Sequence, residues 1–280
     1  MIDYREARPS RPLAGAIECV WWMSAADASA APAERILPDG CTEWVIHLGD
    51  RFLQEDGAGR WARQPRAFVV GPTDRALRIK PGRRVDSLGV RFRPGALARF
   101  LRLPLHSLSG RTPALDELFG SSATSLVGEL GEDKDAASRV RRLDAFLARI
   151  AAHHTPPPAG VGAAVETALA SRGAATVDAL ATACGLGRRQ LERRFLEEVG
   201  LPPKVLLRLI RFQSVFQALG RDPAAAWVHL ALDCGYTDQA HLVREFRDFS
   251  GEPPSRTLLE QGPLSRRFTS PERLRALLGG

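Results

Sequence analysis

An internal repeat in the C-terminal third constrains the fold more than any other feature of the sequence. Residues 180–186 (LATACGL) align with residues 230–236 (LALDCGY), where leucine, alanine, cysteine and glycine recur at an offset of 50. Further along, Gly-Leu-Pro-Pro at 200–203 aligns with Gly-Glu-Pro-Pro at 251–254, at an offset of 51. A repeat of this kind indicates that one supersecondary unit is built twice.

Each copy has the pattern of a helix, a tight turn and a second helix. Gly185 and Gly235 stand where a chain leaving a helix needs a positive φ angle, which other residues adopt only at a cost in free energy. Ala181 and Ala231 are small enough for two helices to cross closely. In each second helix, leucine and phenylalanine four residues apart predict a buried pair, Leu191 with Phe195 and Leu242 with Phe246.

The ends of these helices carry further signals. Thr176 can cap the first helix of the first copy, and Asp222 followed by Pro223 predicts the start of the first helix of the second copy. Between the copies, apolar periodicity over residues 204–219 predicts a longer helix that holds the two units at a fixed separation. Two such units can enter successive major grooves on one face of DNA, about 34 Å apart.

The second helix of each copy carries the polar side chains that we expect to face DNA. In the first copy, this helix begins near Arg188 and presents Arg188, Arg189, Glu192 and Arg193. In the second copy, the outward residues include Gln239, Val243 and Arg244. Arginine can bind guanine or phosphate, glutamine suits adenine, glutamate can accept from cytosine, and valine can contact the thymine methyl group.

Net charge by itself supports DNA binding only weakly. The chain carries a net charge of +7, but residues 161–262 contain 12 Lys+Arg against 12 Asp+Glu, so this part is neutral. DNA binding must therefore depend on where individual arginines lie. The neutral balance leaves open a partner-binding protein that no longer uses its DNA-binding fold.

The first 95 residues are β-rich in pattern. Strand-like runs at 44–48, 67–70 and 87–93 are bounded by turn signals such as Pro-Asp-Gly at 38–40. They predict a small antiparallel barrel or sandwich. From residue 96 to 150 apolar residues recur at helical spacing, which predicts helices that pack on this domain or against a second subunit.

We therefore expect an α+β protein with four segments. They are an N-terminal sensory or dimerisation domain (1–152), a proline-rich linker (153–160), a double helix-turn-helix domain (161–265) and a basic tail (266–280). Three consecutive prolines at 156–158 lack amide donors, so a helix cannot continue through the linker. No segment approaches the roughly 18 uninterrupted apolar residues of a membrane-spanning helix, so we expect no membrane association and a cytoplasmic location.

A pocket inside the N-terminal domain is the candidate site for a small-molecule effector. Charged residues within apolar runs need partners if they are buried, and tryptophans could line such a pocket. The candidates are Trp21, Trp22, Glu43, Trp44, His47, Arg91 and Arg93. Strand alternation offers an alternative, in which Trp44 belongs to the core and the two arginines share an exposed face.

An enzymatic alternative would use Cys41 as nucleophile and His47 as base, as in a DNA-repair alkyl acceptor. Such chemistry needs a thiolate activated by a neighbour, and one cysteine near one histidine is a common coincidence. The four cysteines are far apart without a C-x-x-C pair, and the predicted strands contain a single histidine. We therefore expect neither enzymatic activity nor a metal or other cofactor.

The repeat resembles the DNA-binding domain of the AraC/XylS family of bacterial regulators. The resemblance covers residues 161–262 and is strongest at 180–185, 200–203 and 234–242. It implies a seven-helix domain with two helix-turn-helix units in adjacent major grooves. It also implies the base-reading residues Arg189, Glu192 and Arg193 in the first unit, and Gln239, Ala240, His241, Val243 and Arg244 in the second. Gly187 departs from the serine that commonly caps the first reading helix.

Residues 37–43, 47–50 and 88–95 resemble a poorly characterised domain found ahead of DNA-binding domains of this family. That resemblance implies a sensory or dimerising role and names no ligand. The expected partners are double-stranded DNA, a small-molecule effector or a second copy of the chain as modulator, and RNA polymerase if the protein is an activator. The sequence leaves open whether it activates or represses.

Overall fold

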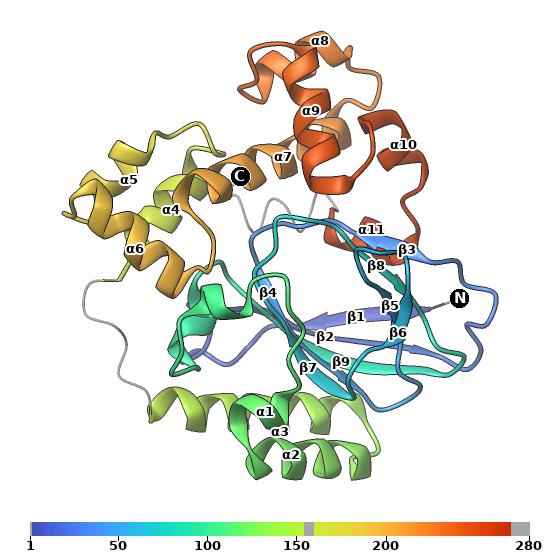
Figure 1. Cartoon of the computed structure of the whole chain (residues 1–280). Helices are drawn as coiled ribbons and strands as arrows, with labels where there is room; N and C mark the ends of the chain where they lie inside the picture. Colours follow the sequence, from blue (N-terminus) through green and yellow to red (C-terminus); the bar gives the residue numbers. More distant parts are fainter. Residues whose placement is uncertain (1, 154–159, 270–280) are drawn as a thin grey trace.

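The computed structural model describes residues 2–153 and 160–269. Over these ranges an N-terminal antiparallel sheet domain precedes a C-terminal helical domain (Figure 1). The α+β prediction is therefore confirmed. Six residues of the predicted linker (154–159) and most of the predicted basic tail (270–280) lie outside the described residues.

Two antiparallel sheets form the N-terminal domain. The five-stranded sheet has the order β1 (Asp3–Ala7), β2 (Ile17–Ala25), β9 (Val85–Phe92), β4 (Thr42–His47) and β7 (Ala67–Val70). The four-stranded sheet has the order β3 (Glu34–Ile36), β8 (Leu77–Lys80), β5 (Leu53–Glu55) and β6 (Trp61–Arg63). The described strands form two separate sheets, so the sandwich alternative is confirmed and the closed barrel is wrong.

Side-chain alternation in the five-stranded sheet separates two buried environments. In β4, Trp44 and Ile46 join one hydrophobic cluster, whereas Val45 joins another on the opposite face. All six residues of β4 are buried, because both faces of the strand are covered. A strand covered on both faces shows a continuous apolar run, which is why sequence alternation alone could not say which face Trp44 occupies.

Helices cover the outer face of the five-stranded sheet. They are α1 (Leu115–Phe119), α2 (Ser121–Glu132) and α3 (Ala136–Ala152), which lie together below the sheet in Figure 1. Trp44 packs against Phe119 and Phe146 from this layer, with ring centroids 4.8 and 6.3 Å away. The segment predicted as helix after residue 95 instead begins with two short 3-10 helices, η1 (Ala96–Arg99) and η2 (Leu105–Leu108).

Seven helices between residues 160 and 260 form the helical domain, followed by α11 (Pro263–Phe268). They are α4 (Gly162–Ala170), α5 (Val177–Ala183), α6 (Arg188–Glu198), α7 (Pro203–Arg221), α8 (Trp227–Asp233), α9 (Gln239–Ser250) and α10 (Pro254–Leu259). The two helix-turn-helix units, α5–α6 and α8–α9, lie at opposite ends of the long helix α7 (Figure 1). This is the arrangement that the repeat predicts.

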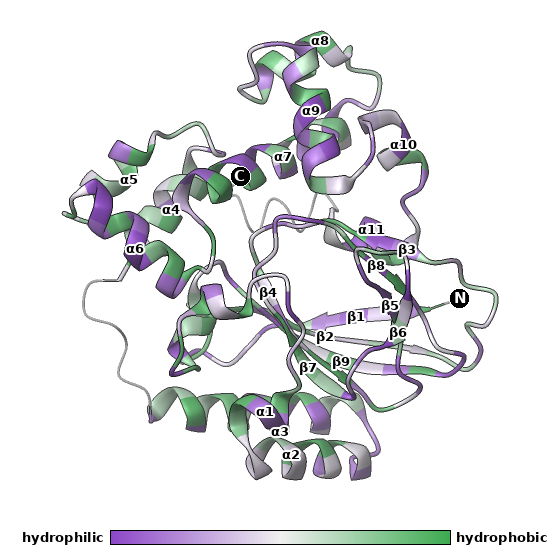
Figure 2. Ribbon diagram, viewed as in Figure 1, coloured by the Kyte–Doolittle hydropathy of each residue, from purple (hydrophilic) through white to green (hydrophobic). Residues whose placement is uncertain are grey.

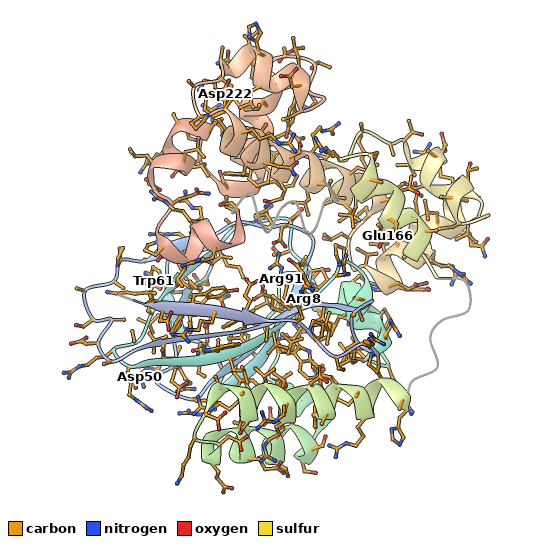
Figure 3. The ribbon with its side chains drawn as sticks, turned by 180° about the vertical axis from the view of Figure 1, so that it is seen from behind. Arg8, Asp50, Trp61, Arg91, Glu166 and Asp222 are labelled. Atoms are coloured by element: carbon orange, nitrogen blue, oxygen red, sulfur yellow. The ribbon has the colours of Figure 1, made fainter. Side chains whose placement is uncertain are left out.

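Most of the local signals are found where the sequence places them. Gly185 and Gly235 have φ angles of 63° and 78°, and the Thr176 side chain accepts a hydrogen bond from the Ala179 amide at the start of α5. The predicted cap at Asp222 is wrong: α8 begins at Trp227, and Asp222 instead accepts from the Ala224 amide in the preceding turn. Figure 3 shows Asp222 at the outer edge of the helical domain.

The helical domain packs directly on the sheet domain. Leu37 and Cys41, from the loop before β4, belong to the hydrophobic core of the helical domain. The Gln213 amide on α7 donates to the Pro38 carbonyl oxygen over 2.7 Å, and both partners are buried. At the other end of the interface, the buried Glu34 carboxylate on β3 accepts from the Leu264 and Ser265 amides of α11, each over 2.9 Å.

No helix in the described part of the chain has the length and apolar character needed to cross a membrane.

Candidate functional site

The first candidate site is the exposed face of α6. Leu191 and Phe195 are fully buried and fix the helix to its domain, whereas Arg188, Arg189, Glu192 and Arg193 are exposed. Figure 2 shows this helix as mostly hydrophilic. Gly187 occupies the N-cap and makes no side-chain cap hydrogen bond. All four predicted DNA-facing residues of the first unit therefore lie on one solvent face.

Ion pairs distinguish the arginines of this face. Arg188 pairs with Glu192 over 3.3 Å, and Arg193 pairs with Glu197 over 3.0 Å. Exposed pairs of this type contribute roughly 0–1 kcal/mol, so a phosphate or a base can replace the carboxylate. Arg189 makes no ion pair with any residue that the structure describes.

The C-terminal end of α6 packs against the sheet domain. The His106 ring contacts the Leu196 carbonyl oxygen at 3.3 Å, and Ser109 donates to the Gly200 carbonyl over 2.8 Å. Burial and desolvation raise the pKa of Glu198, which accepts from the Val161 amide at this end of the helix. The N-terminal turns of α6 remain accessible, and these are the turns with which recognition helices contact bases.

The corresponding face of α9 is less basic, with one arginine among its predicted contact residues where α6 has three. Gln239, Ala240 and Arg244 are exposed, whereas Val243 is half-buried. Asp238 caps the helix by accepting from the His241 amide over 2.7 Å, and this hydrogen bond lowers the pKa of the Asp238 carboxyl. Arg244 makes no ion pair within the described ranges, so its guanidinium is available for DNA.

His241 already has contacts within its own unit. Its Nδ1 atom lies 3.2 Å from the Thr237 hydroxyl, and its ring meets Tyr236 edge-on at 5.2 Å. Its Nε2 atom lies 3.8 Å from the buried Glu245, which also pairs with Arg208 of α7. These contacts favour a structural role for His241, while a base contact by this residue stays a prediction.

The second candidate site is a cavity of about 90 Å³ between the two sheets. Its walls are mainly apolar and come from both sheets, with Trp21, Val45 and Phe68 on one side and Ile36, Leu77 and Ile79 on the other. Leu264 of α11 completes the wall. Two groups of polar side chains line it, one around Arg91 and one around His47.

Three carboxylates surround Arg91 at the first polar group. The guanidinium donates through Nε to Glu18 over 2.8 Å and through Nη1 to Glu43 over 2.6 Å, and its Nη2 pairs with Asp39. Burial alone would lower the pKa of Arg91, but the negative charges around it outweigh burial and raise that pKa well above its ordinary value. Arg91 therefore stays charged, and Figure 3 shows it inside the molecule on the side of the sheet below the helical domain.

His47 occupies the second polar group as a neutral side chain. Burial lowers the pKa of His47 to about 4, although the hydrogen bond to Gln64 acts in the opposite direction. Its Nε2 lies 3.0 Å from Gln64 Oε1 and its Nδ1 lies 2.9 Å from the Ser87 hydroxyl. Because an amide oxygen can only accept, Nε2 carries the proton and Nδ1 accepts from Ser87.

These contacts weaken the enzymatic alternative. His47 is hydrogen-bonded through Nδ1 to Ser87 and through Nε2 to Gln64, and the Cys41 thiol contacts Glu18 at 3.8 Å. His47 is therefore not placed to take a proton from Cys41.

The structure brings together Trp21, Glu43, His47 and Arg91 from the predicted effector set. The other three predicted residues do not line this cavity. Trp22 and Trp44 belong to the cluster on the opposite face of the sheet, together with Val20 of β2 and Ile46 of β4, and Trp44 packs against Phe119 of α1. Arg93 follows the end of β9 and lines a separate hollow near Gly95 and Glu198.

Sequence reasoning missed two carboxylates of the Arg91 group. Glu18 lies on the neighbouring strand, β2, and Asp39 lies in the turn before β4. Strand pairing brings Glu18 to Arg91, because the next residue, Cys19, is the cross-strand partner of Arg91. This pairing is a property of the fold and gives no signal in the sequence.

Two domain families match the sequence. The family described as a domain of unknown function (DUF6597) matches residues 5–113, and the family described as a helix-turn-helix domain matches residues 180–259. No curated protein matches the chain.

Among solved structures, the fold is similar to ToxT from Vibrio cholerae, with a TM-score of 0.47 and 8% identity over 93% of this chain and 98% of that chain. A ToxT structure with a bound unsaturated fatty acid gives a TM-score of 0.44 and 11% identity over 93% and 95% of the two chains. Likenesses at this level do not bear on function. With the repeat, the two exposed helix faces and the family matches together, the chain carries an AraC-type helix-turn-helix DNA-binding domain behind an N-terminal domain of the unknown-function family.

Proposed function

We propose that the chain is a transcription regulator that binds double-stranded DNA through α6 and α9 together. The supporting observation is the placement of two helix-turn-helix units at the ends of one helix, α7, each with an exposed polar face (Figures 1 and 2). The 19 residues of α7 span about 28 Å at 1.5 Å per residue. This length is comparable to the roughly 34 Å between successive major grooves.

Within this proposal, the three cations that we expect to dominate affinity are Arg189 and Arg193 of α6 and Arg244 of α9. Arg189 and Arg244 carry no ion pair in the described part of the chain, and Arg193 must give up only an exposed partner. Gln239 and Glu192 are exposed beside them and would add sequence preference through base edges.

The test is a binding titration with DNA fragments that the purified protein selects from its own genome. We expect Arg189→Ala, Arg193→Ala and Arg244→Ala together to weaken binding at least about tenfold, because each good base contact contributes about 1–3 kcal/mol. Fluorescence anisotropy over a range of salt concentrations gives the affinity and the salt slope. The slope should become shallower by up to about 0.9 for each phosphate that the variant no longer neutralises.

A matched control removes three exposed arginines from the sheet domain: Arg8, Arg11 and Arg63, each to Ala. This variant has the same loss of charge and should bind almost as the original chain does. Equal affinity of the two triple variants would contradict the proposal, because it would mean that only overall charge matters.

We further propose that the cavity in the sheet domain is the effector site. The segment 37–41 lies between the cavity and α7: Leu37, Pro38, Asp39 and Cys41 line the cavity, while the Pro38 carbonyl accepts from Gln213 and Gly40 lies beside Leu206. A ligand that moves this segment would change its contacts with α7, the helix that separates the two helix-turn-helix units.

A further inference from the structure

A basic hollow of about 570 Å³ lies where the sheet domain meets the C-terminal end of α9. The two domains touch there through the loop between β7 and β8, whose Ala76 amide donates to the Phe249 carbonyl oxygen of α9 over 2.8 Å. Figure 1 shows this end of α9 above the sheet domain. Five arginines and two aspartates line the hollow, with three of the arginines from the sheet domain and two from the helical domain. Both domains therefore contribute cations to one surface.

Ion pairs divide these arginines into two kinds. Arg75 and Arg247 are exposed and form no ion pair within the described ranges, so their guanidinium groups are free to bind an external anion. Among the described residues of the lining, Asp74 is the one carboxylate without an ion pair, so the unpaired charge of the lining is positive. Neighbouring carboxylates hold the other three arginines: Arg35 by Glu252 and Glu260, Arg78 by Glu55, and Arg208 by Glu245 and Asp248.

Arg247 continues the base-facing side of α9 toward the sheet domain. Ala240, Arg244 and Arg247 are spaced by four and three residues, so they lie on one side of the helix. A second hollow, lined by Arg244 among others, shares Arg247 and Asp248 with the basic hollow, so the two surfaces adjoin.

The dimensions of DNA place phosphates at this position. Arg247 lies about 10 Å further along α9 than Ala240, at 1.5 Å per residue. The major groove is about 8.5 Å deep. When the first turn of α9 reaches the bases, Arg247 and the basic hollow therefore lie level with the phosphates at the edge of the groove.

Hydrogen bonds fix the backbone of Arg75 on this surface. The Thr73 hydroxyl accepts from the Arg75 amide and donates to the Arg75 carbonyl oxygen, both over 3.1 Å. The next residue, Ala76, is held by its hydrogen bond to Phe249. Because the backbone is already ordered on both sides of Arg75, a contact made by its side chain loses less conformational entropy.

We propose that Arg75, a residue of the sheet domain, binds a phosphate of the DNA backbone at the edge of the groove that α9 enters, beside Arg247. The N-terminal domain then takes part directly in DNA binding, through a contact that neutralises charge and reads no base. The inference rests on the proposed function, in which α9 enters a major groove.

A duplex fits the basic hollow better than a free small anion does. Arg75 and Arg247 are exposed and come from different domains, and exposed ion pairs of this kind contribute little by themselves. A phosphate in bound DNA is already held near them by α6 and α9, so the additional contact does not need a separate association step.

The experiment compares two duplexes that contain one selected binding site. The long duplex extends about one helical turn, about 10 base pairs, beyond the groove occupied by α9, and the short duplex ends at that groove, as mapped by hydroxyl-radical footprinting. We expect Arg75→Ala to weaken binding to the long duplex about three- to tenfold, and to make the salt slope shallower by up to about 0.9, because one phosphate is no longer neutralised. On the short duplex, which lacks this phosphate, Arg75→Ala and the original chain should bind almost equally.

Two matched variants separate a phosphate contact from a general loss of charge. Arg75→Lys should keep most of the affinity and the original salt slope, since an ammonium group also neutralises a phosphate. Arg63→Ala removes another exposed arginine of the sheet domain, from β6, and should leave binding to both duplexes unchanged. The loss in Arg75→Ala should also be the same for any base sequence in the extension, because the contact reads no base.

Either of two results would overturn the inference: unchanged binding of the long duplex by Arg75→Ala, or equal losses on the long and short duplexes. If the triple variant of α6 and α9 weakens binding while Arg75→Ala does not, this inference alone fails. If Arg75→Ala weakens binding to the long duplex while the triple variant binds as the original chain does, the phosphate contact stands and the proposed role of α6 and α9 fails.

Discussion

His47 illustrates how a single buried residue links the fold to solution pH. Its ring stacks on Phe52 with centroids 4.9 Å apart, and both nitrogens are hydrogen-bonded. Burial disfavours the protonated ring, which is why the pKa of His47 falls from 6.5 to about 4. The unfolded chain therefore takes up a proton at this residue at a higher pH than the folded chain does.

This difference predicts that stability falls as pH decreases from 6.5 to 4. The contribution of His47 is complete above pH 6.5 and is lost toward pH 4, by about 3 kcal/mol at most. His47→Gln removes the titrating group, so we expect the variant to lose less stability over this interval, whatever its stability at pH 7. Urea unfolding at several pH values measures the free energy of unfolding of both proteins. Parallel curves of this free energy against pH would contradict the pKa assignment.

Within the helical elements, glycine has opposite effects on stability: it is favoured in the turn after a helix and disfavoured inside one. Gly235 ends the α8 turn at a φ angle of 78°, a region that side chains with a β-carbon disfavour. Gly128 lies within α2, exposed, and a β-carbon there would meet nothing within 4 Å. The same substitution therefore tests two different backbone requirements.

We expect Gly235→Ala to lower the free energy of unfolding by about 1–2 kcal/mol, because the left-handed conformation must be kept. Gly128→Ala should raise it by about 0.5–1 kcal/mol, since alanine loses less backbone entropy in a helix. Denaturant unfolding of both variants provides the comparison. A stable Gly235→Ala protein would show that the turn relaxes without a positive φ.

At the scale of the whole molecule, the two domains share one interface centred on α7. Gln213 is completely buried and its amide reaches a backbone carbonyl of the other domain. Gln217, one turn further along the same helix, is also buried, but its amide nitrogen has no partner among the described residues. The helix thus offers two buried glutamines that differ in whether they bridge the domains.

Replacing each glutamine with leucine keeps its approximate volume and tests this difference. Gln213→Leu leaves the Pro38 carbonyl unpaired and should cost about 1–3 kcal/mol, whereas Gln217→Leu should be close to neutral. Differential scanning calorimetry shows in addition whether Gln213→Leu separates the unfolding of the two domains. Equal losses in the two variants would mean that the bridging hydrogen bond contributes little.

The sequence predicts the helical domain in more detail than the sheet domain for a physical reason. Glycine turns and leucine–phenylalanine pairs act between neighbours in the sequence, so the repeat reveals both units and α7. The Arg91 group depends on Glu18, Asp39 and Glu43, up to 73 residues away, which only strand pairing brings together. Trp44 is ambiguous in the sequence because β4 is buried on both faces.

The docking of α11 on β3 means that a C-terminal helix completes the N-terminal domain. Glu34 holds the first turn of α11 through two backbone amides, and Leu264 from the same helix forms part of the cavity wall. An isolated N-terminal fragment ending before residue 160 would therefore have an open hole where the intact protein has a wall. Ligand screening on such a fragment would probe a different receptor from the one that the full polypeptide builds.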